Sequence, residues 1–222
     1  MTNEKLTYEQ FSSKGRELID SYTKMADGGY QGRDGNFVEN AFSDFELRPF
    51  RKLIKDTIDK YQATTVLDYG CGGADWSQNG FDQETGRSAI DYFGISQVNL
   101  YEPARDIDQR EMSDCVVSFD VLEHIFISDV PNVIRDMLRF AKKIAIINVA
   151  CYPANALLPN GENAHITVRH PIWWKGMFDA IAPEFPNVDI FLCCSESYGK
   201  LGKFEIFSDA ARQGSTLFVN NS

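Results

Sequence analysis

Residues 64–73 read TTVLDYGCGG, and this stretch predicts the fold. Its first half is β-branched and apolar, which is typical of a strand in a parallel sheet that is covered on both faces. The glycines that follow allow the backbone to turn sharply and to approach a bound ligand. Asp68 comes where the strand ends, so we expect its carboxylate in the crevice beyond the carboxyl ends of the strands, where open α/β sheets bind ligands.

The spacing of these glycines distinguishes two classes of ligand. A dinucleotide-binding turn has the pattern G-x-G-x-x-G/A; Gly70 and Gly72 fit it, but Asp75 stands at the third position. An acid there would face a pyrophosphate, which such a helix start attracts by its positive potential. A strand followed by D-x-G-x-G instead resembles the first motif of the class I S-adenosylmethionine-dependent methyltransferases. The alternative that remains is a structural turn without a ligand.

Two later stretches resemble further motifs of the same family. Residues 98–101 (VNLY) form a predicted strand that is followed by Glu102. An acid at the end of this second strand can accept hydrogen bonds from both hydroxyls of a ribose. Residues 115–125 (CVVSFDVLEHI) are similar to the fourth motif in the small-molecule branch of the family, the type 11/12-like methyltransferases. The resemblance extends over residues 50–220.

This resemblance implies a set of cofactor-binding residues at the ends of three strands. They are Asp68, Tyr69, Gly70, Cys71, Gly72, Tyr101, Glu102, Pro103, Phe119, Asp120 and Val121. Phe119 and Asp120 would line the methionine end of S-adenosylmethionine. Asp120 also has a structural interpretation, as an acid that stabilises a helix start through the dipole.

The order of the predicted elements indicates an α/β fold. Apolar strands alternate with amphipathic helices, as a doubly wound sheet requires. We expect residues 44–222 to form a single domain with a mostly parallel, seven-stranded sheet, the Rossmann-like fold that the resemblance implies, closed by an antiparallel hairpin. Its third strand is short or missing, because residues 104–113 leave little room for it. Residues 1–43 are predicted to form a helix and a glycine-rich lid, with a slack connector as the alternative.

The connection 151–170 is expected to determine the methyl acceptor. It has no clear periodicity, and loops of this length inside compact domains are usually functional or disordered. By the resemblance it lies near the reactive methyl group, and the predicted substrate-binding residues are Tyr30, His124, Asn163, His165 and Trp174. His165 is the candidate catalytic residue, because a neutral imidazole can take a proton from the acceptor. Alternatively, Asn163 and His165 only pin the loop through hydrogen bonds to the backbone.

Composition limits the partners and the location. The 222 residues carry a net charge of −10, and no Lys/Arg cluster exceeds a pair, so nucleic acid is an unfavourable partner. No apolar run approaches the ~18 residues of a membrane span, and residues 1–5 do not resemble a secretory signal. We therefore expect a cytoplasmic protein that does not bind membranes. The five cysteines include no C-x-x-C pair, and we expect no metal site.

Together these observations predict an enzyme that transfers a methyl group from S-adenosylmethionine to an O or N atom of a small molecule, such as a sugar or another metabolite. One alternative is a catalytically silent protein that binds S-adenosylmethionine or a partner. An NAD-dependent oxidoreductase is less favoured, because of Asp75 and because Glu102 follows the first motif by more than the usual ~20 residues. The sequence does not predict the acceptor or the oligomeric state.

Overall fold

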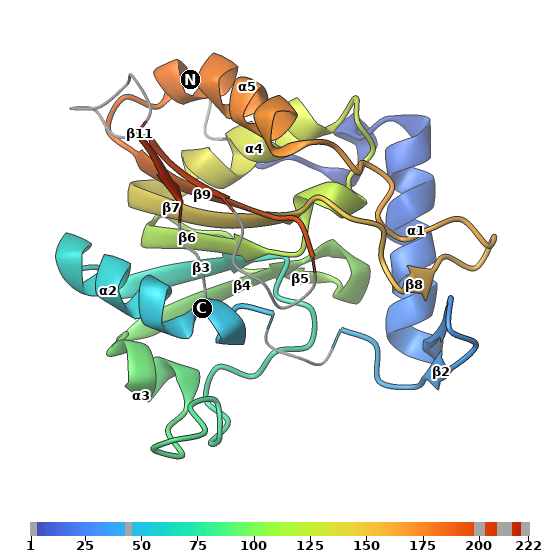
Figure 1. The fold of residues 1–222 in the computed structure, drawn as a ribbon, viewed down its shortest axis with the longest axis horizontal. Helices are drawn as coiled ribbons and strands as arrows, with labels where there is room; N and C mark the ends of the chain where they lie inside the picture. Colours follow the sequence, from blue (N-terminus) through green and yellow to red (C-terminus); the bar gives the residue numbers. More distant parts are fainter. Residues whose placement is uncertain (1–3, 43–45, 198–202, 208–214, 219–222) are drawn as a thin grey trace.

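The computed structural model describes residues 4–42, 46–197, 203–207 and 215–218. A mostly parallel sheet forms the centre of the molecule (Figure 1), with the strand order β11-β10-β9-β7-β6-β3-β4-β5. These strands are β3 (Thr65–Tyr69), β4 (Gln97–Glu102), β5 (Ile107–Asp108), β6 (Ser113–Phe119), β7 (Ala141–Ala150), β9 (Asp189–Ser195), β10 (Lys203–Phe207) and β11 (Ser215–Phe218).

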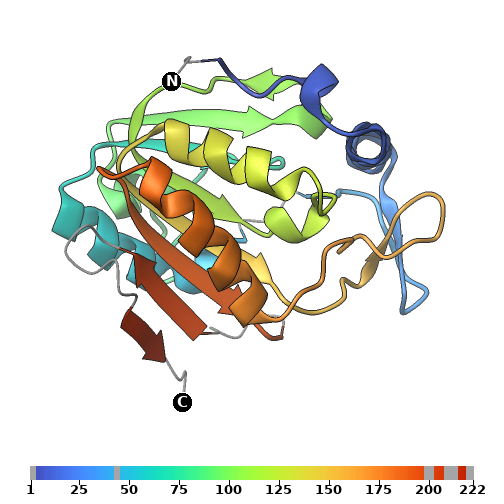
Figure 2. The same cartoon turned by 90° about the horizontal axis from the view of Figure 1, so that it is seen from above.

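Helices cover both faces of this sheet. Helices α2 (Arg51–Tyr61) and α3 (Ala89–Phe93) lie on one face, and α4 (Val130–Arg139) and α5 (Pro171–Ile181) lie on the other (Figures 1 and 2). The structure also contains short 3₁₀ helices: η1 (Tyr8–Gln10), η2 (Arg48–Phe50), η3 (Pro103–Arg105), η4 (Leu122–His124) and η5 (Ala182–Glu184). None of the described helices combines the length and the apolar character needed to cross a bilayer.

Strand β3 is the centre of the packing, as its apolar run predicts. Val66 and Leu67 are both fully buried. Because side chains alternate along a strand, Val66 packs in the core beneath α2 and α3, whereas Leu67 packs in the core beneath α4 and α5. Burial on both faces explains why consecutive residues of this strand are apolar up to Asp68, instead of alternating with polar residues.

The predicted α/β class with a mostly parallel sheet is confirmed. The adjacent strands β9, β7, β6, β3 and β4 are parallel. Along the chain, β4 and β6 are separated by the two-residue strand β5, which pairs antiparallel with β4 and agrees with the predicted short third strand. At the opposite edge of the sheet, β10 and β11 form an antiparallel hairpin. The sheet has eight strands, where seven were predicted.

The parallel part of the sheet has an order that several ligand classes share. Read from β4 to β9, the strands lie in the order 2-1-4-5-6 of the doubly wound dinucleotide-binding sheets. Strand order therefore does not distinguish between these ligand classes. Only the residues at the strand ends can distinguish between them.

The N-terminal segment forms a wall at the carboxyl ends of the strands. Helix α1 (Ser13–Gly28) stands there across the sheet (Figure 1). Strands β1 (Tyr30–Gly32) and β2 (Phe37–Val38) then form a hairpin, and β1 also pairs with β8 (Ala156–Leu157). Residues 30–38 thus form a hairpin, and the segment expected to be a lid or a connector shares one small sheet with the expected acceptor loop.

A buried carboxylate ties this N-terminal segment to the core. Asp136, on α4, accepts hydrogen bonds from Arg110 Nη1 at 2.6 Å, from the Tyr69 hydroxyl at 2.8 Å and from the backbone N–H of Leu6 at 2.9 Å. The side chains of Arg110 and Asp136 are both almost fully buried. Such a pair is costly to break, because the remaining charge stays in a low-dielectric environment.

We predict that Asp136→Ala lowers the free energy of unfolding by about 3–5 kcal/mol, because it leaves the Arg110 guanidinium buried without this partner. The exposed pair Lys175–Asp179 on α5 is the control, and Lys175→Ala should cost less than ~1 kcal/mol. Urea unfolding at neutral pH measures both changes. Equal losses in the two variants would contradict the structural role of Asp136.

Candidate functional site

A cavity of about 650 Å³ lies at the carboxyl ends of β3, β4 and β6. Its volume is within the usual range for small-molecule sites, and open α/β sheets bind their ligands at this edge. Side chains from α1, the β1–β2 hairpin and the segment before β8 line its other wall. The residues predicted to bind the cofactor all line this cavity: Asp68, Tyr69, Gly70, Cys71, Gly72, Tyr101, Glu102, Pro103, Phe119, Asp120 and Val121.

The backbone conformation of the turn after β3 requires glycine at two positions. Gly70 has a φ of +87° and Gly72 a φ of +55°, a region that other residues rarely occupy. A Cβ atom on Gly70 would lie 2.3 Å from Val121 Cγ2, and one on Gly72 would lie 2.6 Å from the Phe42 carbonyl oxygen. The turn is therefore in direct contact with the end of β6 and with the N-terminal segment.

The backbone N–H groups of this turn are used within the protein. Five consecutive groups each donate to a protein oxygen: Gly70 and Cys71 to Tyr101 O, Gly72 to Glu102 Oε2, Gly73 to Phe42 O, and Ala74 to Cys71 O. The next helix, α3, begins only at Ala89. A pyrophosphate site needs free N–H groups at a helix start, so the turn lacks the donors that a dinucleotide requires.

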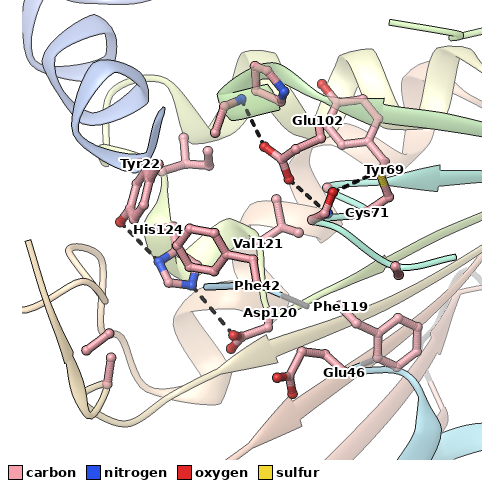
Figure 3. Close-up of a pocket in the computed structure, with 18 of the residues that line it drawn as sticks. Tyr22, Phe42, Glu46, Tyr69, Cys71, Glu102, Phe119, Asp120, Val121 and His124 are labelled. Atoms are coloured by element: carbon pink, nitrogen blue, oxygen red, sulfur yellow. Dashed lines mark hydrogen bonds and ion pairs between the residues drawn. The ribbon is translucent and has the colours of Figure 1, made fainter. Parts of the chain in front are cut away.

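Two carboxyl groups stand beside the turn. Asp68 is 5% exposed and accepts a hydrogen bond of 2.8 Å from Trp76 Nε1. Burial raises the pKa of Asp68 to about 7, against the opposing effect of the Trp76 N–H, and the charge of Glu102 adds to the rise. Glu102 accepts hydrogen bonds from the backbone N–H groups of Gly72 and Ala104, each at 3.0 Å, and burial raises its pKa as well (Figure 3). Both groups would ionise more readily beside a cationic ligand.

Asp120 and two histidines form the polar end of the cavity. Asp120 directly follows β6 and has a φ of +59°, a left-handed conformation that Asp tolerates better than most residues. Its Oδ1 atom lies 3.5 Å from His165 Nε2, and its Oδ2 atom lies 3.7 Å from His124 Nε2. Figure 3 shows His124 between Asp120 and the Tyr22 hydroxyl, which lies 3.0 Å from His124 Nδ1.

The two rings affect the Asp120 carboxyl strongly. Burial opposes its ionisation, but the hydrogen bonds and charges of His124 and His165 outweigh this effect and hold the pKa of Asp120 well below its usual range. Asp120 is therefore a carboxylate in the folded protein.

Three of the residues predicted to bind substrate line the cavity, and two do not. Tyr30, His124 and His165 are in its wall. Asn163 instead binds its own loop: its Oδ1 accepts from the N–H groups of Ala154 and His165, and its Nδ2 donates to Ala154 O. The structure therefore does not place Asn163 in the cavity wall, where it was predicted, and its side chain holds the loop through hydrogen bonds to the backbone, as in the alternative interpretation.

The placement of Trp174 in the acceptor pocket is also wrong. Trp174 is fully buried in the core beneath α5, together with Phe178 and Ile181. These residues share one face of the helix because they are spaced at i, i+4 and i+7. The helical spacing was visible in the sequence, but the side chain was assigned to the loop that precedes it.

Several residues of the cavity wall were not predicted, among them Tyr22, Phe42 and Tyr152. Tyr22 lies near Leu18 and Met25 in the helical pattern of α1 and pairs its hydroxyl with Ala164 O at 2.6 Å. A tyrosine within an apolar helical stripe is the signal that could have identified it. Phe42 and Tyr152 carry no such signal, because their place depends on how α1 and the 151–170 connection cross the sheet.

Comparisons with protein-family models, with curated proteins and with solved structures find no match to this chain. Its function must therefore be inferred from the chemistry of the cavity.

We predict that Asp68→Asn stabilises the protein more at pH 8 than at pH 5, by about 2 kcal/mol. The folded-state pKa of Asp68 is raised to about 7, so its contribution to stability is fully present below the unfolded pKa and is lost as the pH rises through the folded pKa. Asparagine does not titrate and keeps an acceptor for Trp76. Urea unfolding of both proteins at the two pH values measures the difference.

The control for this prediction is Asp56→Asn, which changes an exposed carboxylate on α2. Its effect on stability should be the same at both pH values. A pH-independent effect of Asp68→Asn would show that Asp68 ionises normally in the folded protein.

Proposed function

We propose that this chain is a class I methyltransferase that transfers a methyl group from S-adenosylmethionine to an O or N atom of a small molecule. The observation that carries the proposal is the turn after β3, where the N–H groups are occupied and the charged side chains that line the cavity beside them are the buried Asp68 and the half-buried Glu102. The Arg105 guanidinium also approaches the turn, at Gly73, and it donates to Ala41 O. Such a site disfavours a pyrophosphate and favours a ligand with positive groups, and S-adenosylmethionine carries a sulfonium and an ammonium.

Each carboxyl would have a distinct role. Each oxygen of Glu102 accepts one backbone N–H and has capacity for another hydrogen bond. The two oxygens of this carboxylate could therefore accept hydrogen bonds from both hydroxyls of a ribose. Asp68, held by Trp76, would face the ammonium group and ionise on binding. The methionine end would then extend toward Phe119 and Asp120, where the cavity meets the two histidines.

The protein's part in the reaction is alignment and proton removal. When bound, S-adenosylmethionine supplies an activated methyl group, and a neutral thioether is the leaving group. The wall formed by α1, the β1–β2 hairpin and the 151–170 connection would hold the acceptor atom in line with the carbon and the sulfur, and such alignment can contribute several kcal/mol. The proton of the acceptor would leave at the polar end, where His165 lines the cavity.

Two other functions make different predictions. A catalytically silent binding protein would bind S-adenosylmethionine without turnover and would be indifferent to changes at His165. An NAD-dependent oxidoreductase fits the strand order of the sheet, but it would require phosphate donors that the turn uses internally.

We predict that calorimetric titration detects binding of S-adenosylmethionine and S-adenosylhomocysteine at micromolar concentrations and no binding of NAD. Asp68→Ala and Glu102→Ala should each weaken the binding of S-adenosylmethionine at least about tenfold, or ~1.4 kcal/mol. Glu111→Ala, which removes an exposed acid near β5, is the matched control and should leave binding unchanged. Failure of both adenosyl compounds to bind, or tight binding of NAD, would contradict the proposal.

A further inference from the structure

The polar end of the cavity contains ring nitrogens whose protonation can be assigned. His124 Nδ1 lies 3.0 Å from the carbonyl oxygen of Ala164, and His165 Nδ1 contacts the carbonyl oxygen of Tyr152. A carbonyl oxygen can only accept a hydrogen bond, so in both rings Nδ1 carries the proton. The Tyr22 hydroxyl donates to Ala164 O, which leaves its oxygen free to accept from His124 as well. In the neutral rings, each Nε2 is then a lone-pair acceptor.

Both Nε2 atoms face a group that also only accepts. The Asp120 carboxylate lies 3.5 Å from His165 Nε2 and 3.7 Å from His124 Nε2, and the two rings are nearly perpendicular with centroids 4.8 Å apart. The lone pairs of three groups, the Asp120 carboxylate and the two Nε2 atoms, therefore point into one space at the cavity wall. Without a metal ion, this space is filled by protons on the Nε2 atoms, and the charged rings then donate to Asp120. A bound cation would take the place of these protons.

We propose that Asp120, His124 and His165 bind a divalent transition-metal ion through one carboxylate oxygen and the two Nε2 atoms. Their ligand atoms all lie within 4.8 Å of one another. Ligands at ~2.1 Å from a tetrahedral zinc ion lie about 3.4 Å apart, so only small shifts are needed to close the site. Two imidazoles and a carboxylate suit Zn²⁺, Mn²⁺ or Fe²⁺ and leave at least one position open to the cavity.

The surroundings of the three residues support a metal site. Histidine ligands of metals commonly donate their other N–H to a backbone carbonyl, which orients the ring, and both rings do so here. The fully buried Glu123 accepts from the backbone N–H of Ala150, while its Oε2 atom has no hydrogen-bond partner among the described residues. A cation on the nearby Asp120 would place a positive charge beside this buried carboxyl.

This inference rests on the proposed methyl transfer for its functional meaning. A metal ion lowers the pKa of a bound hydroxyl, so the site points to an acceptor that binds through an oxygen. The O–H proton would pass to solvent, the oxygen would form the bond to the methyl carbon, and the C–S bond would break with its electrons moving to sulfur. His165 would then act as a ligand of the metal and not as the general base.

The experiment is metal binding to chelator-treated full-length protein, measured by equilibrium dialysis with Zn²⁺ and with Mn²⁺. We expect one ion per chain in the wild type. His124→Ala and His165→Ala should each weaken metal binding by more than about 100-fold. This exceeds the roughly 10–100-fold loss that is typical when a residue that only hydrogen-bonds to a metal ligand is removed. His170→Ala is the control: His170 is exposed and caps α5, and this variant should bind as the wild type does.

A second readout does not depend on the folding of the variants. Co²⁺ added to the wild type should produce visible absorption bands of a low-coordinate site, and Zn²⁺ should abolish them. No stoichiometric ion in the wild type, or equal affinity in all the histidine variants, would overturn the inference. Titration of the same metal-free protein with S-adenosylmethionine separates the two proposals. If the protein binds S-adenosylmethionine but no metal ion, only the metal site is refuted. If it binds a metal ion but no S-adenosylmethionine, only the proposed cofactor is refuted.

Discussion

The hydrogen bonds of the turn after β3 are the constraint on which the site depends. Five consecutive N–H groups of this turn donate to protein oxygens, among them the carbonyl of Phe42 from the N-terminal segment and the carboxylate of Glu102 from β4. These bonds join the central strand, its neighbour and the wall of the cavity. Beside the turn, the charged side chains that line the cavity are Asp68 and Glu102, and the proposed preference for a cationic ligand rests on these two acids.

The buried acids of the cavity are costly for the folded state. Asp68 and Glu102 both line the cavity and have pKa values raised by burial, which means that their charged forms are destabilised there. The two apolar cores on either side of the sheet supply the compensating stability. Residues that oppose stability and yet converge on one cavity are expected where function requires them.

The sequence predicted the sheet and the strand-end wall of the cavity well, because both follow from local patterns. Apolar runs identify the parallel strands, and Asp68, Glu102 and Asp120 each come where such a strand ends. Since the carboxyl ends of parallel strands meet at one edge, acids distant in the sequence could be placed together without knowledge of the packing.

The other wall was less predictable, because it depends on tertiary packing. Asn163 and Trp174 were placed in the pocket for their nearness in sequence to His165, but one binds its own loop and the other faces the core. The meeting of Asp120 with His165 depends on how the 151–170 connection folds back over the sheet. No spacing in the sequence indicates this, and the three possible metal ligands were therefore not connected.

The most direct test of the central claim is a crystal structure of the protein grown with S-adenosylhomocysteine. We expect the adenosyl ligand in the cavity beyond β3, β4 and β6, with the ribose hydroxyls on Glu102, the amino group toward Asp68 and the sulfur toward Asp120. An empty cavity at saturating ligand, or a ligand bound elsewhere on the protein, would contradict it.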